Sequence, residues 1–239
     1  MLFLYVRHGD PIYEPDSLTE EGHRQAEALS KRLARYGVDE IYASTSNRAR
    51  LTAKPTCEKL GLEATLLDWA NEYYAFCDMS VRKEDDTRCW CFYSAAFKEK
   101  FVHPEVRALG NKWYEHELFK DEGFAAGVQR VDREADEFFR SLGYEHERET
   151  GRFKAIQPNE KRVALFAHQG FGLLFLSSVL GIPYNEFCVR FDLSCSSMTA
   201  IRFDVSADGY VYPKLMQLSN DGHLYKEGLS TLYNGELEL

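Results

Sequence analysis

Leu2-Phe3-Leu4-Tyr5-Val6-Arg7-His8-Gly9 is the stretch of sequence from which both the fold and the chemistry can be inferred. Its apolar first part is typical of a buried β-strand, after which Gly9 can turn the chain. An open α/β sheet gathers its ligand-binding groups at this end of its strands. Arg7 offers a fixed fork of donors suited to phosphate, and the ring of His8 is largely deprotonated near neutral pH. The pair suggests a site where a phosphate is held and then attacked.

The composition narrows the class of protein. The chain has 239 residues, of which 44% are hydrophobic, enough for one large domain with a sizeable core. A formal net charge of -9 and a pI near 5.4 disfavour nucleic acid and anionic membrane surfaces as partners. The longest apolar run, Phe171 to Leu180, is about half of what a membrane span needs. We therefore expect no signal peptide or membrane segment, and a cytoplasmic location.

The cysteines raise one question about metal. The sequence has six cysteines, which we expect to be reduced thiols in the absence of a secretory signal. Cys89-Trp90-Cys91 forms a Cys-x-Cys pair with Cys77 and His103 nearby in sequence, so a zinc site there is conceivable. No second paired motif supports it. We therefore expect buried or idle thiols, no metal and no cofactor.

The first third of the chain alternates between strand and helix patterns. Thr19 is a suitable cap for a helix that ends at Gly37, and the next helix pattern follows Ser44-Thr45-Ser46. Pro55 is expected to kink or end this second helix. Short strands are predicted at residues 2–6, 40–43 and 64–67. Such alternation is typical of a parallel sheet with helical crossovers.

The pattern changes after the third strand and later returns. Residues 73–142 are mainly helical, and apolar residues at helical spacing from Val128 to Leu142 predict an amphipathic helix. Further predicted elements are a hairpin at 144–156, a strand at 163–167, a buried helix at 171–180, and a strand pair at 198–205 and 210–218 around a turn at 207–209. We predict one three-layer αβα domain with a mostly parallel central sheet. Its core covers about residues 1–72 and 157–239, and a largely helical cap, about 73–156, covers the active-site edge.

Charged residues follow several of these strands. Arg7 and His8 end the first strand, Arg48 opens the helix after the second, Glu72 follows the third, and His168 follows the strand at 163–167. Because parallel strands end at the same edge of a sheet, these groups can converge. Two arginines and two histidines suit a tetrahedral anion, and a carboxyl group beside them is a candidate proton donor.

These segments resemble the histidine phosphatase superfamily, in its phosphoglycerate-mutase-like branch. The resemblance extends over most of the core in the order found in that family. The matching segments are Leu4-Tyr5-Val6-Arg7-His8-Gly9, Leu18-Thr19-Glu20-Glu21-Gly22 with Gln25-Ala26, Ser44 to Arg48-Ala49 with Thr52-Ala53, and His168-Gln169-Gly170. The interval from Tyr73 to Ile156 matches only as an insertion of suitable length.

The resemblance implies a role for each residue. His8 would be the nucleophile that forms a phosphohistidine, and Glu72 would protonate the leaving oxygen and then activate water. The phosphoryl oxygens would be bound by the side chains of Arg7, Arg48 and His168, with help from the backbone at Gln169. This chemistry requires a neutral imidazole, and neighbouring guanidinium groups favour that form. It requires no metal.

Two departures from the family pattern favour hydrolysis over mutase action. Many members have Glu or Gln after Arg-His-Gly and a phosphate-binding Asn a few residues later, whereas this chain has Asp10 and Glu14. We expect Glu14 to point away from the phosphate. The loop from His8 to Leu18 is also shorter than in mutases.

The expected function is therefore hydrolysis of a small phosphomonoester. Alternatives are a phosphoglycerate-mutase-type phosphotransferase and a non-catalytic phosphate-binding protein on the same fold. Self-association is compatible with the sequence, and the physiological substrate cannot be read from it. Carboxylates that compete with Glu72 for the proton-donor role are Asp10, Glu14, Asp68 and Asp78.

Overall fold

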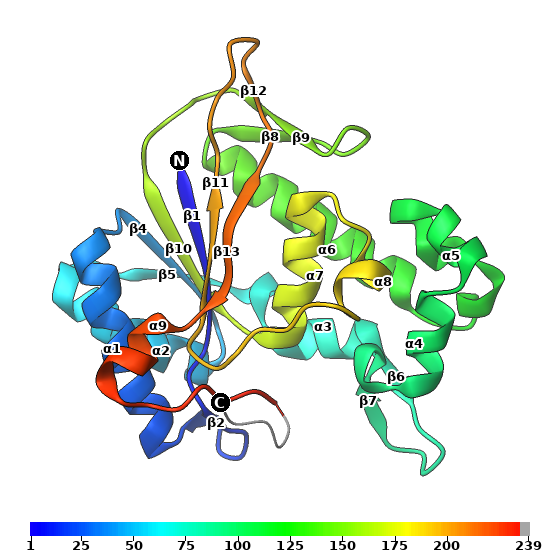
Figure 1. Ribbon diagram of the computed structural model, residues 1–239, viewed down its shortest axis with the longest axis horizontal. Coiled ribbons are helices and arrows are strands. Elements are labelled where there is room, and N and C mark those ends of the chain that lie inside the picture. Colours follow the sequence, from blue (N-terminus) through cyan, green and yellow to red (C-terminus); the bar gives the residue numbers. More distant parts are fainter. Residues whose placement is uncertain (235–239) are drawn as a thin grey trace.

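The computed structural model describes residues 1–234 and is built around a central sheet (Figure 1). The sheet has the strand order β13-β11-β1-β10-β4-β5. Strands β1, β10, β4 and β5 are parallel, with β5 at one edge of the sheet, and β11 pairs antiparallel with both β1 and β13. The strands are β1 (Leu2–Arg7), β4 (Glu40–Ser44), β5 (Ala64–Leu67), β10 (Arg162–Ala167), β11 (Met198–Arg202) and β13 (Lys214–Asn220).

Helices cover both faces of this sheet, which confirms the three-layer αβα prediction. On one face lie α1 (Glu20–Tyr36), α2 (Asn47–Leu60) and α9 (Gly222–Glu227), and on the other lie α6 (Phe124–Ser141) and α7 (Gln169–Leu180) (Figure 1). The face under α6 and α7 is filled largely by aromatic rings. Phe139, for example, packs 5.2 Å from Phe3 and 5.1 Å from Phe203, measured between ring centroids.

Local signals explain where α1 begins and ends, but not the length of α2. The side chain of Thr19 accepts a hydrogen bond from Gly22 N, and Gly37 follows α1 with a φ of 76°. Helix α2 continues through Pro55 to Leu60, so the prediction that Pro55 ends this helix is wrong. The proline removes one helical hydrogen bond. Burial of Thr52, Ala53 and Thr56 along the same helix outweighs that loss.

Helix α7 starts immediately after His168, at the edge of the sheet where the parallel strands β1, β4 and β10 end. Its residues are buried on almost every side, as the sequence predicted, and Gly181 ends it in the left-handed conformation with a φ of 64°. The surrounding helices and the sheet supply that burial. Across residues 1–234, no helix combines the length and apolarity that crossing a membrane requires.

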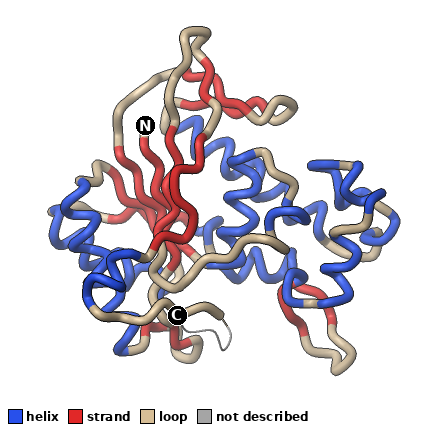
Figure 2. Tube along the Cα trace, viewed as in Figure 1, coloured by secondary structure: helices blue, strands red, loops and turns tan. Residues whose placement is uncertain are grey.

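The interval from residue 73 to 156 has one part that extends away from the central sheet and one part that packs against it (Figure 2). Its helices α4 and α5 extend away from the sheet, whereas α6 packs against it and leads into a hairpin of β8 and β9. The division of the chain into core and cap stays a prediction. The elements of this interval are α3 (Glu72–Met79), β6 (Ser80–Arg82), β7 (Arg88–Trp90), η2 (Cys91–Tyr93), α4 (Ala95–Phe101), α5 (Pro104–Ala108), η3 (Gly110–Glu115), η4 (Glu117–Phe119), α6, β8 (Tyr144–Glu147) and β9 (Arg152–Ala155).

The predicted closing strand pair is only partly correct. Strands β11 and β13 do pair antiparallel, but Tyr210–Val211 form a separate strand, β12, which pairs with β9. Pro213 separates β12 from β13, because a proline has no N–H to give to a strand ladder. The remaining short elements are β2 (Pro11–Ile12), β3 (Ser17–Leu18), η1 (Asp68–Ala70) and α8 (Tyr184–Phe187).

Phe139 provides a test of the aromatic layer. Its ring is fully buried among Phe3, Phe153 and Phe203. We expect Phe139→Ala to cost about 4 kcal/mol and to lower the Tm by roughly 10 °C, measured by calorimetry. The matched control is Tyr225→Ala, because Tyr225 is 90% exposed. Equal Tm values for the two variants would contradict this assignment of the core.

Candidate active site

The carboxyl ends of β1, β4 and β10 bring the predicted site residues to one edge of the sheet. The register of β1 against β10 pairs Arg7 with Ala167, so the residues that follow, His8 and His168, are neighbours. Their ring centroids lie 5.2 Å apart with the rings tilted by 64°.

His8 is buried to 3% exposure, yet it lines an open cavity of about 400 Å³. Its Nδ1 lies 2.7 Å from the carbonyl oxygen of Gly9. Donation from Nδ1–H to that oxygen leaves Nε2 with its lone pair. Burial, followed by the charges of Arg7 and Arg48, holds the pKa of His8 well below its usual value. The imidazole is therefore neutral at physiological pH, as a nucleophile must be.

His168 is fixed by two residues that the sequence interpretation did not single out. Its Nε2 lies 2.8 Å from Ser44 Oγ at the end of β4. The hydroxyl of Tyr5 donates to the carbonyl oxygen of His168 at 2.6 Å and accepts from its N–H at 3.1 Å. Burial, with the nearby positive charges of Arg48 and Arg7, keeps the pKa of His168 well below its usual value. Ser44 could have been found from sequence, since it too ends a parallel strand.

Arg7 lies behind the cavity wall and is fully buried. One guanidinium nitrogen donates to the carbonyl oxygen of Leu193, and the other donates to the side-chain oxygen of Asn234. Its Nε has no hydrogen-bond partner within the described part of the chain. Asn234 lies far from every motif in sequence, so no sequence signal pointed to it.

Arg48 lies in the first turn of α2, where it lines the cavity and pairs with an acid. It donates to Asp16 Oδ1 at 2.8 Å. Although partial burial opposes the shift, hydrogen bonding and charge from Arg48 lower the pKa of Asp16. Asp16 also accepts from Asn47 N at 2.6 Å, which ties the first loop to α2. The sequence interpretation considered Glu14 here, but Glu14 is exposed and does not line the cavity.

Glu72 opens α3 and faces the start of α7. Its two carboxylate oxygens accept hydrogen bonds from Gly170 N at 3.1 Å and Phe171 N at 3.0 Å. Burial raises the pKa of Glu72 above its usual value, against the opposing effects of these N–H groups and of the arginines. Glu72 and His8 line the same cavity.

The competing carboxylates have other partners. Asp68 accepts hydrogen bonds from Thr45 and Tyr74, Asp78 pairs with Arg130, and Asp10 bonds to Thr19. Of the carboxylates considered from sequence, Glu72 is the one found among the residues lining the cavity in the described part of the chain.

Gln169 uses its side chain to tie the cavity wall together. Its Oε1 accepts from Tyr93 at 3.0 Å and from Asn234 at 2.6 Å, and its Nε2 donates to Asp192. Its backbone N–H lies at the first position of α7, where a helix provides no acceptor. The cavity is lined by His8, Tyr13, Asp16, Ser46, Arg48, Asn71, Glu72, Tyr73, Phe76, Trp90, Gln169 and Asn234.

The cysteine pair considered from sequence does not form a metal cluster among residues 1–234. Cys91 is buried with its Sγ 3.5 Å from the Tyr184 hydroxyl, and burial raises the pKa of this thiol to about 12. Cys77 is exposed and Cys89 is half-buried.

Comparison with known families agrees with this arrangement. The family model "histidine phosphatase superfamily (branch 1)" matches residues 4–211, which include every residue of the candidate site described above except Asn234. The chain belongs to the histidine phosphatase superfamily. A search among curated proteins returned no match.

Solved structures show the same fold. A mycobacterial glucosyl-3-phosphoglycerate phosphatase is 17% identical and has a TM-score of 0.58, with 91% of this chain and 98% of that chain covered. A phosphoserine phosphatase from Entamoeba histolytica is 16% identical, with a TM-score of 0.58 and 93% and 98% covered. An α-ribazole phosphatase from Shigella flexneri is 19% identical, with a TM-score of 0.57 and 92% and 97% covered.

The Tyr5 hydroxyl provides a stability test of this histidine phosphatase site. Tyr5→Phe removes the hydroxyl and leaves the buried N–H and carbonyl of His168 without their partner. We expect a loss of about 2 kcal/mol in the free energy of unfolding, measured by urea denaturation. Tyr42→Phe is the control, since its hydroxyl bonds to Glu40 in a half-buried position and water can replace it. A Tyr5→Phe variant with an unchanged free energy of unfolding would show that this hydroxyl does not fix His168.

Proposed function

We propose that this protein is a phosphatase that hydrolyses a small phosphomonoester through a phosphohistidine on His8, without a metal. The observation that carries the proposal is that the buried side-chain atoms without hydrogen-bond partners among residues 1–234 include three nitrogens of the candidate site: Arg7 Nε, Arg48 Nε and His168 Nδ1. Buried polar groups are rarely left unpaired in native proteins. These three belong to the residues expected to bind phosphoryl oxygens, so a tetrahedral oxyanion supplies the acceptors that they lack.

The first step forms a bond between His8 Nε2 and phosphorus while the bond from phosphorus to the ester oxygen breaks. The hydrogen bond to Gly9 leaves the proton on Nδ1, which frees the Nε2 lone pair for attack. Arg7 and Arg48 stabilise the charge on the phosphoryl oxygens. Glu72 gives its proton to the departing oxygen, and its raised pKa keeps that proton available up to a higher pH than for an ordinary glutamate.

The second step returns the enzyme to its starting state. Glu72, now a carboxylate, takes a proton from water as the water oxygen attacks phosphorus. The bond from phosphorus to His8 Nε2 breaks, and inorganic phosphate leaves. The N–H groups of Gly170 and Phe171 stabilise the carboxylate between the two steps.

The size and lining of the cavity support a small substrate. About 400 Å³ suits a small metabolite, and Tyr73, Phe76 and Trp90 give it an aromatic wall beside the charged floor. The solved structures with this fold include phosphatases named for glucosyl-3-phosphoglycerate, phosphoserine and α-ribazole, which supports a small phosphoester as the substrate.

His8 provides the decisive test. His8→Ala is expected to lower phosphate release from phosphorylated metabolites and aryl phosphates to the uncatalysed background. The wild-type enzyme, quenched in base during turnover of a labelled phosphoester, should yield an acid-labile phosphohistidine peptide that contains residue 8. His23→Ala is the matched control, because His23 is an exposed histidine on α1 outside the cavity. Normal turnover in His8→Ala would rule the mechanism out.

Product analysis and the phosphohistidine measurement separate the two alternative functions from hydrolysis. A mutase would transfer the phosphoryl group between positions of a sugar acid with little release, so product analysis with 3-phosphoglycerate and a bisphosphate primer tests for it. A non-catalytic binding protein would bind phosphoesters without turnover and without a phosphohistidine. The neutral, tautomer-fixed His8 favours catalysis, since binding alone does not need a nucleophile.

The role of Glu72 as proton donor can be tested by varying the leaving group of the substrate and the pH. Glu72→Gln cannot donate a proton, so the rate with alkyl phosphates should fall by about 10²- to 10⁴-fold. Aryl phosphates, whose leaving groups need little protonation, should lose much less. The wild-type rate should decline as the pH rises through the raised pKa of Glu72, because the acid form is then lost. The variant should lack this decline, and an equal loss with both substrates would exclude Glu72 as the acid.

A further inference from the structure

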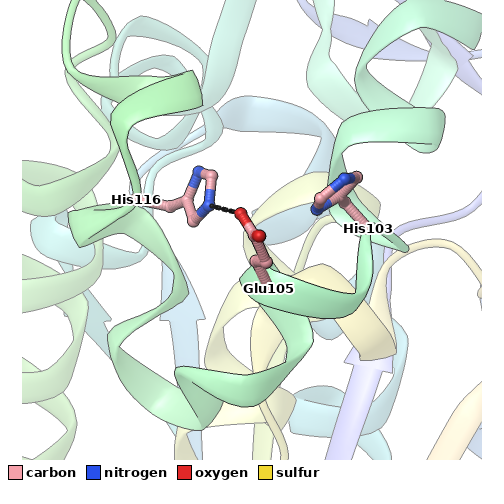
Figure 3. Close-up of side chains that lie close together, drawn as sticks. All are labelled: His103, Glu105 and His116. Carbon is pink, nitrogen blue, oxygen red and sulfur yellow. Dashed lines mark ion pairs between the residues drawn. The ribbon is translucent and has the colours of Figure 1, made fainter.

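Three potential metal ligands converge on the surface of the helical insertion, outside the cavity described above. His103 precedes α5, Glu105 lies in its first turn, and His116 lies between η3 and η4. One donor atom from each of the three residues lies within 4.8 Å of the others. Figure 3 shows Glu105 between the two imidazole rings, and its carboxylate lies 3.5 Å from His116 Nε2.

The backbone that presents these side chains is fixed by a buried aromatic cluster. Trp113, in the segment that leads to His116, is fully buried with its ring centroid 5.3 Å from that of Phe101 and 5.2 Å from that of Phe119. Val106, next to Glu105, is also fully buried. The convergence is therefore built into the fold of the insertion, whereas the donor groups of His103 and Glu105 are exposed and can adjust.

We propose that His103, Glu105 and His116 form a binding site for a divalent transition metal, with Zn²⁺ as the preferred ion. Two imidazoles and one carboxylate are a donor set that zinc favours, with water as the fourth ligand. Zinc bonds of about 2.1 Å at tetrahedral angles separate neighbouring donors by roughly 3.4 Å. The Glu105 carboxylate and His116 Nε2 already have that spacing. Rotation of the exposed His103 side chain can bring its donor nitrogen to the same distance from the other two donors. This site differs from the sequence expectation, which considered cysteine ligands and favoured no metal.

Binding changes the tautomer of His116. Its Nδ1 accepts a hydrogen bond from Leu118 N at 3.2 Å, so the neutral ring carries its proton on Nε2, facing Glu105. A metal bound at Nε2 requires the lone pair there, so the proton moves to Nδ1 and the ring stays neutral. The Leu118 amide then loses its acceptor. This exchange costs little, because Leu118 is exposed and water can accept from its N–H in place of the ring.

The consequence is a structural cross-link within the insertion. The metal would connect the start of α5 to the start of η4, two short elements whose own hydrogen bonds stabilise them little. It would act apart from the catalytic chemistry, since none of the three ligands lines the active-site cavity.

Equilibrium dialysis of the full-length protein against Zn²⁺, followed by metal analysis, tests the site. Wild type and His23→Ala should bind one ion per chain at this site. His103→Ala and Glu105→Gln should weaken binding by more than the roughly tenfold loss typical when an outer-shell partner is removed. A His8→Ala background excludes binding through the catalytic histidines and should bind Zn²⁺ as wild type does. Undiminished affinity in His103→Ala would overturn the proposal.

Two spectroscopic measurements identify the ligands. Co²⁺ in place of Zn²⁺ should give the visible absorption of a tetrahedral nitrogen and oxygen site, whereas strong near-ultraviolet thiolate absorption would assign the ion to cysteines and overturn the proposal. Hydrogen exchange at the Leu118 amide should accelerate on Zn²⁺ addition in wild type but not in His103→Ala. Because His103 is exposed, this variant should fold normally, which circular dichroism and unchanged phosphatase activity would verify.

Discussion

The parallel pairing of β1 with β10 is the constraint on which the rest of the site depends. It sets Arg7 opposite Ala167, so that the next residue of each strand is a histidine. Tyr5 reinforces the register, because its hydroxyl bonds to both backbone groups of His168 across the two strands. A slip of one residue would point each side chain to the opposite face of the sheet. The contact between the rings of His8 and His168 is therefore a consequence of strand pairing.

The start of α7 extends this constraint to α3. Because α7 begins directly after His168, its first free N–H groups point to Glu72, which belongs to a different element. Gly170 allows the Trp90 ring to pack against the start of α7, since a Cβ at residue 170 would come within 2.3 Å of that ring. Gly9 serves the same purpose beside His8, where a Cβ would lie 2.6 Å from the carbonyl oxygen of Gly22. The glycines of the family motifs thus reflect close packing as well as chemistry.

Groups that end strands could be predicted from sequence, and groups held by distant partners could not. The edge rule for parallel sheets located His8 and His168 and, applied further, would have included Ser44. Asp16 and Asn234 contact the arginines across large sequence separations, and their neighbours in sequence give no such indication. Pro55 was misjudged for a related reason. Local chemistry disfavours it within a helix, but tertiary packing of α2 decides the outcome.

In the proposed mechanism, the charges at the site couple phosphate binding to protonation of Glu72. Asp16 is ionised at neutral pH and offsets one of the two arginine charges. With Glu72 also ionised, these four groups together carry no net charge. With Glu72 protonated they carry a single positive charge, which a phosphate dianion prefers. Binding of the dianion must then raise the pKa of Glu72 further, since linkage is reciprocal. In this proposed mechanism the substrate itself promotes the acid form that its leaving group requires, while burial and the charges of Arg7 and Arg48 keep the pKa of His8 low, which leaves the ring neutral for attack.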